Sequence, residues 1–170
     1  MNFFELFDIP LDLFPDEKKL KLNYYQLSKR YHPDINQSSD PASHMEVLEK
    51  SGEVNAGYKV LSQLNLRLKY ILELSSVEMN ANEELPPEFL MEMMDLNEIV
   101  MEAAGDDEKR QKALDELSAR DADIVDKLQE LWDQINVESM EDQQLKKLKS
   151  LYYQQKYLLR IRKNLNRSQN

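Results

Sequence analysis

The chain has 170 residues, a net charge of −10, three glycines and no cysteine. The absence of cysteine excludes a disulfide scaffold, a thiol nucleophile and a cysteine-ligated metal centre in this chain, and three scattered glycines exclude a glycine-rich phosphate loop. The apolar share of 41% and the charged share of 32% are typical of an all-helical protein.

The first 31 residues predict a short helix, a turn and a longer basic helix. The segment Asn2–Asp8 is long enough for one or two helical turns, and Pro10 disfavours helix at the residue before it. Pro15 is a favourable first-turn residue, so the next helix is expected to start there and to end near Tyr31, before Pro33. A buried stripe at helical spacing is expected from Leu20, Tyr24, Leu27 and Tyr31.

A polar loop and two more helices follow. Residues 33–43 have no apolar period and are rich in Pro, Asn, Ser and Asp, which predicts a loop. The next helix has two start signals, Asp40 before Pro41 and the capping box Ser43-x-x-Glu46. Its apolar stripe is Val47, Val54, Tyr58 and Leu61, and residues 64–74 form a further apolar helical segment. Residues 1–74 therefore read as a helical hairpin with short flanking helices.

The second half predicts an antiparallel three-helix bundle. Residues 75–87 are polar and acidic, end in Pro-Pro and are expected to be a linker to a second domain, residues 88–170. Amphipathic segments run from about 88 to 104, where Gly105 ends the helix, from about 107 to 136, and onward from about 139. The second segment places on one face Leu114, Leu117, Ile124, Leu128, Leu131 and Ile135, and the third repeats Leu148, Leu151, Leu158 and Leu165. No stretch alternates long enough to predict a strand.

Charge is unevenly distributed along the chain. Residues 76–142 carry 5 basic and 21 acidic side chains, whereas residues 143–170 carry 8 basic side chains and no acidic one. This pattern suggests that the last two helices lie side by side and antiparallel, although exposed ion pairs contribute only about 0–1 kcal/mol each.

The motif that points to function is Tyr31-His32-Pro33-Asp34, between a basic amphipathic helix and the helix that packs back on it. A helix that ends there presents an imidazole, a rigid ring and a carboxylate at a loop tip. Asp34 can accept charge-assisted hydrogen bonds from an arginine of a partner, and Pro33 lowers the entropy cost of ordering the loop.

With the opening Phe3-Phe4-Glu5-Leu6-Phe7, this motif and its flanking helices make residues 1–74 resemble the J-domain family, co-chaperones that stimulate the ATPase of DnaK-type chaperones. The resemblance implies that a chaperone ATPase domain is bound by His32, Pro33 and Asp34, with Lys29, Arg30 and Tyr25 on the same docking face.

The second half is similar to the HscB family of iron–sulfur-assembly J-proteins, through Phe89-Leu90-Met91-Glu92-Met93-Met94-Asp95-Leu96 and the acidic helix that follows. In that family the bundle holds the scaffold protein IscU and brings it to the specialised chaperone HscA. The resemblance implies a scaffold-binding set of Leu90, Met91, Met94, Asp95, Glu98, Glu102 and, on the last helix, Tyr157. The family has leucine and glutamate where Met94 and Asp95 stand. The resemblance implies that this chain has no cofactor and no catalytic group.

The helical positions support this patch independently. At 100° per residue a ~60° arc contains Phe89, Met93, Leu96 and Val100, which is the expected core face. Met91 falls nearly opposite that arc, and an adaptable apolar side chain there suggests a contact site. Leu90 and Met94 lie on the flank, where both a core position and an exposed position are compatible with the pattern.

Other functions have weaker support. A metalloenzyme using His32, Asp34 and His44 would need ligands held across a loop without fixed geometry, and the bundle has no Glu-x-x-His pair for a di-metal site. The acidic net charge disfavours nucleic acid and anionic membranes as partners, and no apolar run approaches the ~18 residues of a membrane span. The absence of a presequence favours the bacterial cytoplasm over the mitochondrial matrix. A J-protein for a different client and a non-catalytic helical adaptor remain as alternatives.

Overall fold

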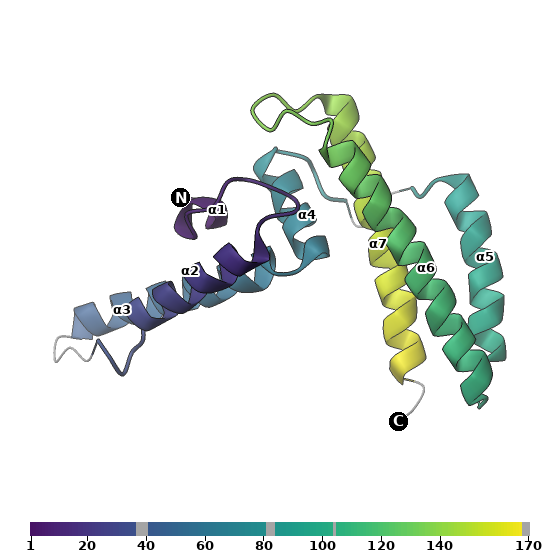
Figure 1. The fold of residues 1–170 in the computed structure, drawn as a ribbon, viewed down its shortest axis with the longest axis horizontal. Coiled ribbons are helices and arrows are strands. Elements are labelled where there is room, and N and C mark those ends of the chain that lie inside the picture. Colours follow the sequence, from purple (N-terminus) through teal and green to yellow (C-terminus); the bar gives the residue numbers. More distant parts are fainter. Residues whose placement is uncertain (37–40, 81–83, 104, 168–170) are drawn as a thin grey trace. The chain divides into compact units, whose positions relative to one another are not determined.

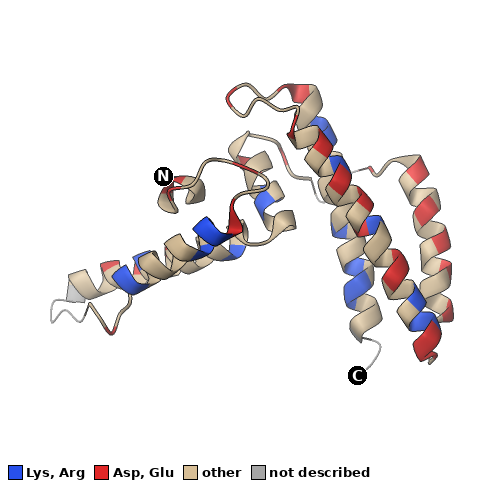
Figure 2. Ribbon diagram, viewed as in Figure 1, with Lys and Arg blue, Asp and Glu red and all other residues tan. Residues whose placement is uncertain are grey.

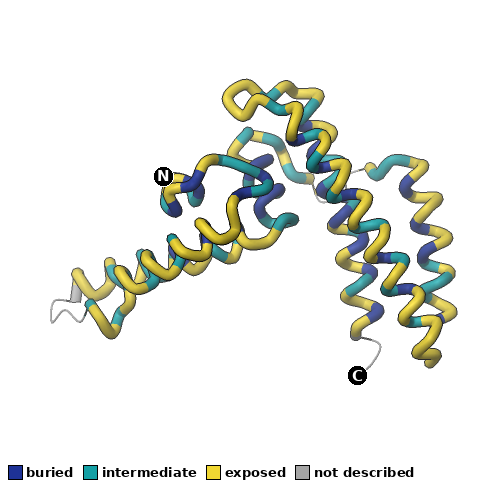
Figure 3. The backbone as a smooth tube through the Cα atoms, in the orientation of Figure 1, coloured by how far each residue is buried: buried dark blue, intermediate teal, exposed yellow. Residues whose placement is uncertain are grey.

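The computed structural model describes residues 1–36, 41–80, 84–103 and 105–167, and these residues form seven helices and no strand (Figure 1). The expected all-α class is confirmed. The chain divides into two compact units, Met1–Ile71 and Leu72–Asn170, each with its own buried side chains (Figure 3).

The first unit begins with a single-turn helix, α1 (Phe3–Leu6), closed by a capping box. The Asn2 side chain accepts the Glu5 N–H at 3.0 Å, and the Glu5 carboxylate accepts the Asn2 N–H at 2.9 Å. Phe4 and Phe7 are buried. A helix of four residues is not stable by itself. The position of α1 therefore depends on the helices that bury its aromatic rings.

The first hairpin helix starts two residues later than expected, whereas the second starts at Pro41, the first of its two expected start signals. Helix α2 (Glu17–Arg30) begins after Asp16, whose carboxylate caps the N–H groups of Lys18 and Lys19, so the expected start at Pro15 is wrong by two residues. Helix α3 (Pro41–Leu61) begins at Pro41, so Ser43 lies inside its first turn and does not open the helix. Proline is preset for the first helical position, which explains the earlier start. Asp40 lies outside the described residues.

The packing of α2 against α3 is tightest near the middle of the hairpin. The rings of Tyr24 and Tyr58 stack with centroids 4.0 Å apart, and the Tyr24 hydroxyl donates to the Asn55 side chain at 3.0 Å. Leu20 is buried, but Leu27 and Tyr31 are only half-buried, so the expected fully buried stripe is wrong towards the loop. Each helix has only one neighbour there, and two helices alone cannot enclose a side chain.

Two glycines of α3 allow a matched test of this packing. A Cβ added at Gly57 would lie 2.8 Å from Phe7 Cε2 and 3.0 Å from Phe3 Cδ1, whereas a Cβ at Gly52 would meet nothing within 4 Å. Alanine gains about 1 kcal/mol over glycine in a helix, and overpacking costs about 1–3 kcal/mol. We expect Gly52→Ala to raise the melting temperature and Gly57→Ala to lower it. Equal shifts in thermal unfolding would show that α1 does not pack on Gly57.

A buried arginine joins three segments of the first unit. Arg67 in α4 (Leu64–Leu74) is 4% exposed. Its Nε donates to the Leu13 carbonyl at 2.7 Å, and its guanidinium also donates to the Leu61 carbonyl. Burial lowers the pKa of Arg67 from its ordinary value. Arg67 thus ties the segment between α1 and α2 to the end of α3.

We expect Arg67→Met to lower the free energy of unfolding by about 2–4 kcal/mol, because two buried carbonyls lose their donors. Urea unfolding followed by circular dichroism measures this loss. Lys59→Met on the exposed side of α3 is the control and is expected to change stability by less than ~0.5 kcal/mol. A similar loss in both variants would contradict the role given to Arg67.

The second unit contains α5 (Pro87–Glu102), α6 (Asp107–Trp132) and α7 (Asp142–Arg167), with neighbouring helices antiparallel (Figure 1). Helix α5 ends at Glu102, two residues before the expected end, and Gly105 follows its C-cap Ala103 with a left-handed φ of +79°. Helix α6 ends four residues before the expected end, so Ile135 lies in the connection and is half-buried, and α7 starts at Asp142 and not near Ser139. The core of the bundle includes Phe89, Met93, Leu96, Ala113, Leu117, Ile124, Leu128, Trp132, Leu148, Leu158 and Leu165.

Acidic residues are concentrated on α5 and α6, and basic residues on α7 (Figure 2). Helices α5 and α6 are joined by ion pairs from Arg120 to Glu92 at 3.1 Å and from Lys109 to Glu102 at 3.5 Å. Helices α6 and α7 are adjacent, as the charge distribution suggested, and the Gln155 amide donates to Asp121 between them at 3.1 Å. The burial of Phe89, Met93 and Leu96 decides which face α5 turns outward, and the exposed ion pairs add little to it.

Candidate functional site

The first candidate surface is the turn that follows α2. The Asp34 N–H donates to His32 Nδ1 at 3.2 Å, and the His32 carbonyl accepts the N–H groups of Ile35 and Asn36 at 3.1 and 3.0 Å. The Asn36 side chain donates to the carbonyls of Arg30 and His32. The turn is therefore held by its own hydrogen bonds, and with Nδ1 as an acceptor the ring proton of His32 is assigned to Nε2.

The charged group of this turn is exposed. The Asp34 side chain is 85% exposed, and its nearer carboxylate oxygen lies 3.9 Å from His32 Nδ1, beyond hydrogen-bond distance. Pro33 is half-buried between the two. A preformed turn with an exposed carboxylate suits recognition by a cationic group, because little entropy is lost on binding.

The outward face of α2 continues from this turn as a basic surface. Lys29 and Arg30 are exposed, and the Arg30 guanidinium lies 5.5 Å from the centre of the Tyr31 ring. Tyr25 is also exposed, with Lys21 Nζ 6.0 Å from its ring centre. Leu22, one turn before Tyr25, is exposed as well and was not expected in this surface. Its position off the buried stripe is the sequence signal that could have identified it.

The second candidate surface is the outer face of α5. Phe89, Met93 and Leu96 point into the bundle core, as expected. Val100, which was also expected in the core, is only half-buried, as is Ile99. Four further apolar side chains are exposed: the exposed fractions are 43% for Leu90, 69% for Met91, 72% for Met94 and 78% for Met101. The open question about the flank is thereby answered, because neither Leu90 nor Met94 is a core residue. The set of exposed side chains Leu90, Met91, Met94 and Met101 is called the apolar patch below.

Carboxylates border the apolar patch. Asp95, Glu98 and Glu102 are all exposed, and Glu102 also pairs with Lys109. A shallow hollow is lined by Met94, Asn97, Glu98, Met101 and Glu102. An apolar centre with a charged border is the usual anatomy of a protein–protein interface.

Tyr157 lies on the α7 side of α5. Its ring meets the Phe89 ring edge to face with centroids 5.9 Å apart, and the Asn97 amide nitrogen lies 3.4 Å from its hydroxyl. The Arg160 guanidinium lies 4.9 Å from the Tyr157 ring centre. Tyr157 is half-buried, so it supports α5 and exposes part of its ring.

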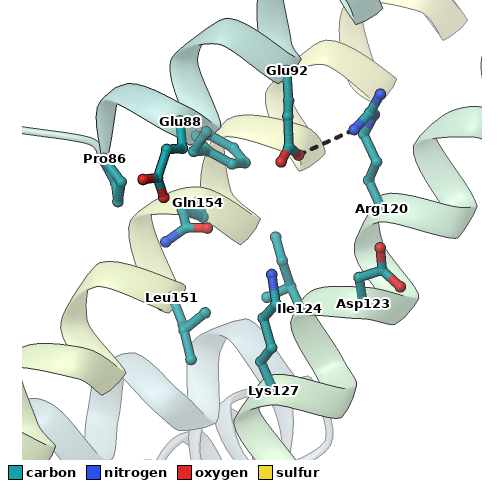
Figure 4. A pocket seen from close by; sticks show the side chains of 10 residues that line it. Pro86, Glu88, Glu92, Arg120, Asp123, Ile124, Lys127, Leu151 and Gln154 are labelled. Carbon is teal, nitrogen blue, oxygen red and sulfur yellow. Dashed lines mark hydrogen bonds and ion pairs between the residues drawn. The ribbon is translucent and has the colours of Figure 1, made fainter.

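A different hollow, of about 250 Å³, lies where α5, α6 and α7 meet (Figure 4). The Arg120–Glu92 ion pair crosses its rim, and Lys127, Asp123 and Gln154 also line it. Both acidic and basic side chains line this hollow. None of the expected site residues is among its lining residues. No group of three or more potential metal ligands occurs within the described part of the chain.

Comparison with known families identifies the two parts of the chain. A DnaJ domain model matches residues 2–70, and a model described as the HSCB C-terminal oligomerisation domain matches residues 85–166. Both parts of the chain therefore match domains of the HscB family. The two family domains thus follow one another in the order expected from the sequence.

Curated relatives of the HscB family match part of their own length. A co-chaperone protein HscB homolog of Vibrio cholerae is 34% identical over 100 residues, which are 58% of each chain. A homolog from Acinetobacter baumannii is 36% identical over 111 residues, covering 65% of this chain and 62% of the relative. The matched region therefore spans about three fifths of these relatives.

Solved structures show the same fold over nearly the whole chain. The chaperone HscB from Vibrio cholerae aligns with a TM-score of 0.81 at 24% identity, covering 99% of this chain and 98% of that one. The human co-chaperone protein HscB aligns with a TM-score of 0.88 at 22% identity, covering 99% of this chain and 82% of that one. Within the described residues, no helix has the length and apolarity needed to cross a bilayer.

Proposed function

We propose that this HscB-family protein is a J-domain co-chaperone in iron–sulfur cluster assembly. It binds an IscU-type scaffold protein, delivers it to an HscA-like chaperone of the DnaK type and stimulates the ATPase of that chaperone. The observation that carries the proposal is that two exposed surfaces of different chemistry, the His32-Pro33-Asp34 turn and the apolar patch, lie on separate units of one chain.

The chaperone-binding surface is the turn together with the basic face of α2. Asp34 offers its carboxylate to a cation of the chaperone, while Lys29 and Arg30 favour an acidic surface beside it. His32 and Pro33 keep the turn in one conformation, and Tyr25 adds an exposed ring to the same face. Such charged contacts speed association and fix orientation more than they add affinity.

The scaffold-binding surface is the apolar patch with its acidic border. Leu90, Met91 and Met94 bury apolar area on binding, and methionine adapts its shape to an irregular partner. At the border Asp95, Glu98 and Glu102 favour basic groups on the scaffold. Tyr157 supports this surface from α7.

The protein supplies no catalytic group and needs no cofactor in this scheme. ATP is bound and hydrolysed by the chaperone, and the cluster is carried by the scaffold. We place the protein in the bacterial cytoplasm, because the curated relatives described above come from bacteria. Neither nucleic acid nor a membrane is a partner.

The test is an ATPase assay with a purified HscA-like chaperone, an IscU-type scaffold and this protein, added singly and together. We expect the scaffold alone and this protein alone each to stimulate ATP hydrolysis by the chaperone weakly. Added together, they should stimulate it more than the sum of their separate effects. Stimulation that is unchanged by the scaffold would show that the client is a different protein. No stimulation under any condition would contradict the proposed J-domain function.

A further inference from the structure

Arg160 is an exposed cation at the edge of the apolar patch that the expected binding set does not include. It lies one turn after Tyr157 on α7, with its guanidinium 4.9 Å from the centre of that ring. Among the residues that the structure describes, Arg160 enters no ion pair. Its charge is therefore available to a partner.

The ring beneath Arg160 is held from two sides. The hydroxyl of Tyr157 lies 3.4 Å from the Asn97 amide nitrogen, and its ring packs edge to face against Phe89, which is buried. Both contacts come from α5, the helix that carries the apolar patch. Because Tyr157 is fixed, it limits the positions open to a guanidinium stacked on it, and less entropy is lost when that guanidinium binds a ligand.

Stacking leaves the hydrogen-bonding capacity of Arg160 in place. A guanidinium stacked on an aromatic ring uses its planar face, while its N–H donors point outward in the plane and match the two oxygens of a carboxylate. A lysine could carry the same charge but could not stack or bind both oxygens in this way. The arrangement thus favours a carboxylate as the partner of Arg160.

Apolar atoms lie on the same side of α5. Asn97, which contacts Tyr157, also lines the shallow hollow with Met94 and Met101. Met101 is 78% exposed, and the resemblance to the family did not assign it a role. Asn97 therefore connects the hollow to Tyr157, the ring on which Arg160 stacks. A client side chain that enters the hollow would bring the neighbouring client residues close to α7.

We propose that Met101 on α5 and Arg160 on α7 are further residues of the client-binding surface, beside the expected Tyr157. The matching client surface carries an apolar side chain for the hollow and, beside it, an aspartate or glutamate for Arg160. The acidic border of α5 favours basic groups on the same client, so the client is expected to carry both charges around an apolar centre. This inference rests on the proposed function, because it takes the IscU-type scaffold as the client.

The test is calorimetric titration of the full-length protein with an IscU-type scaffold. We expect Arg160→Glu to raise the Kd about tenfold and Arg160→Lys to raise it about threefold, because lysine keeps the charge but not the stacked fork. Met101→Ala is expected to raise the Kd about threefold. The loss in Arg160→Glu should shrink as the salt concentration rises.

The matched control is Lys147→Glu. It makes the same change of charge on the same helix about 20 Å from Arg160, where Lys147 lines a hollow shared with α6. It is expected to change the Kd less than twofold, and unchanged melting curves would show that all four variants fold.

The outcomes separate the inference from the function. If the wild-type protein binds the scaffold and Arg160→Glu binds equally or more tightly, Arg160 lies outside the client surface and the inference is wrong. If Lys147→Glu weakens binding as much as Arg160→Glu, only net charge matters and the inference is wrong. If the wild-type protein does not bind the scaffold, the proposed client is wrong and the inference fails with it.

Discussion

Asp34→Asn is expected to abolish stimulation of the chaperone ATPase. Asparagine keeps the shape of the side chain but removes its charge, and a hydrogen bond to a charged group contributes about 1.5–3 kcal/mol. The side chain is 85% exposed and the turn is closed by backbone and Asn36 contacts that the substitution leaves in place. Stability should therefore change by less than ~0.5 kcal/mol. Steady-state ATPase titrations and a melting curve measure the two effects.

The control for this variant is Asp126→Asn, an identical change at an exposed position of α6. It should stimulate the ATPase as the wild-type protein does. Both variants should bind the scaffold normally, because neither changes the apolar patch. If Asp34→Asn stimulated hydrolysis like the wild-type protein, the turn after α2 would not be the chaperone-binding element.

The second large effect is expected from replacing Leu90, Met91 and Met94 together with alanine. These side chains supply most of the exposed apolar surface at the start of α5, and we expect the scaffold Kd to rise at least tenfold, about 1.4 kcal/mol. Because apolar area is buried, binding by the wild-type protein should show a negative heat-capacity change that the variant reduces. Calorimetric titration at several temperatures measures both quantities.

Met93→Ala is the control that separates binding from packing. Met93 lies between the substituted residues but is 1% exposed, so its truncation is expected to cost about 2–5 kcal/mol of stability. The triple variant should instead leave the melting temperature nearly unchanged. Met91→Ala is the simplest single variant, because Met91 lies farthest from the core face. Normal binding by Met91→Ala, together with a triple variant that melts like Met93→Ala, would place the client site elsewhere.

Helical periodicity predicted the core face of α5 but not the state of its flank. Phe89, Met93 and Leu96 repeat at helical spacing, and their burial is confirmed. Leu90 and Met94 lie about 100° away, where burial depends on which side of α5 the last helix occupies. The sequence contains that information only through long-range packing, and the contact of Asn97 with Tyr157 shows where α7 lies.

Features that depend on single hydrogen bonds also could not be predicted from the sequence pattern. The sequence pattern does not single out Arg67, because arginine is rarely buried, and only the path of the chain brings two carbonyls within its reach. The start of α2 depended on whether Asp16 or Pro15 occupied the capping position. The apolar period continued through Ile135, but α6 ends at the buried Trp132.

The division of the chain into two units has a thermodynamic consequence if both surfaces bind as proposed. A client held by one unit and a chaperone held by the other are joined through a single polypeptide, so each meets the other at an effective concentration above its concentration in free solution. A chaperone that binds the client weakly on its own would then bind it almost fully. Covalent linkage, without any tighter contact, would direct the chaperone to one client among the many proteins it meets.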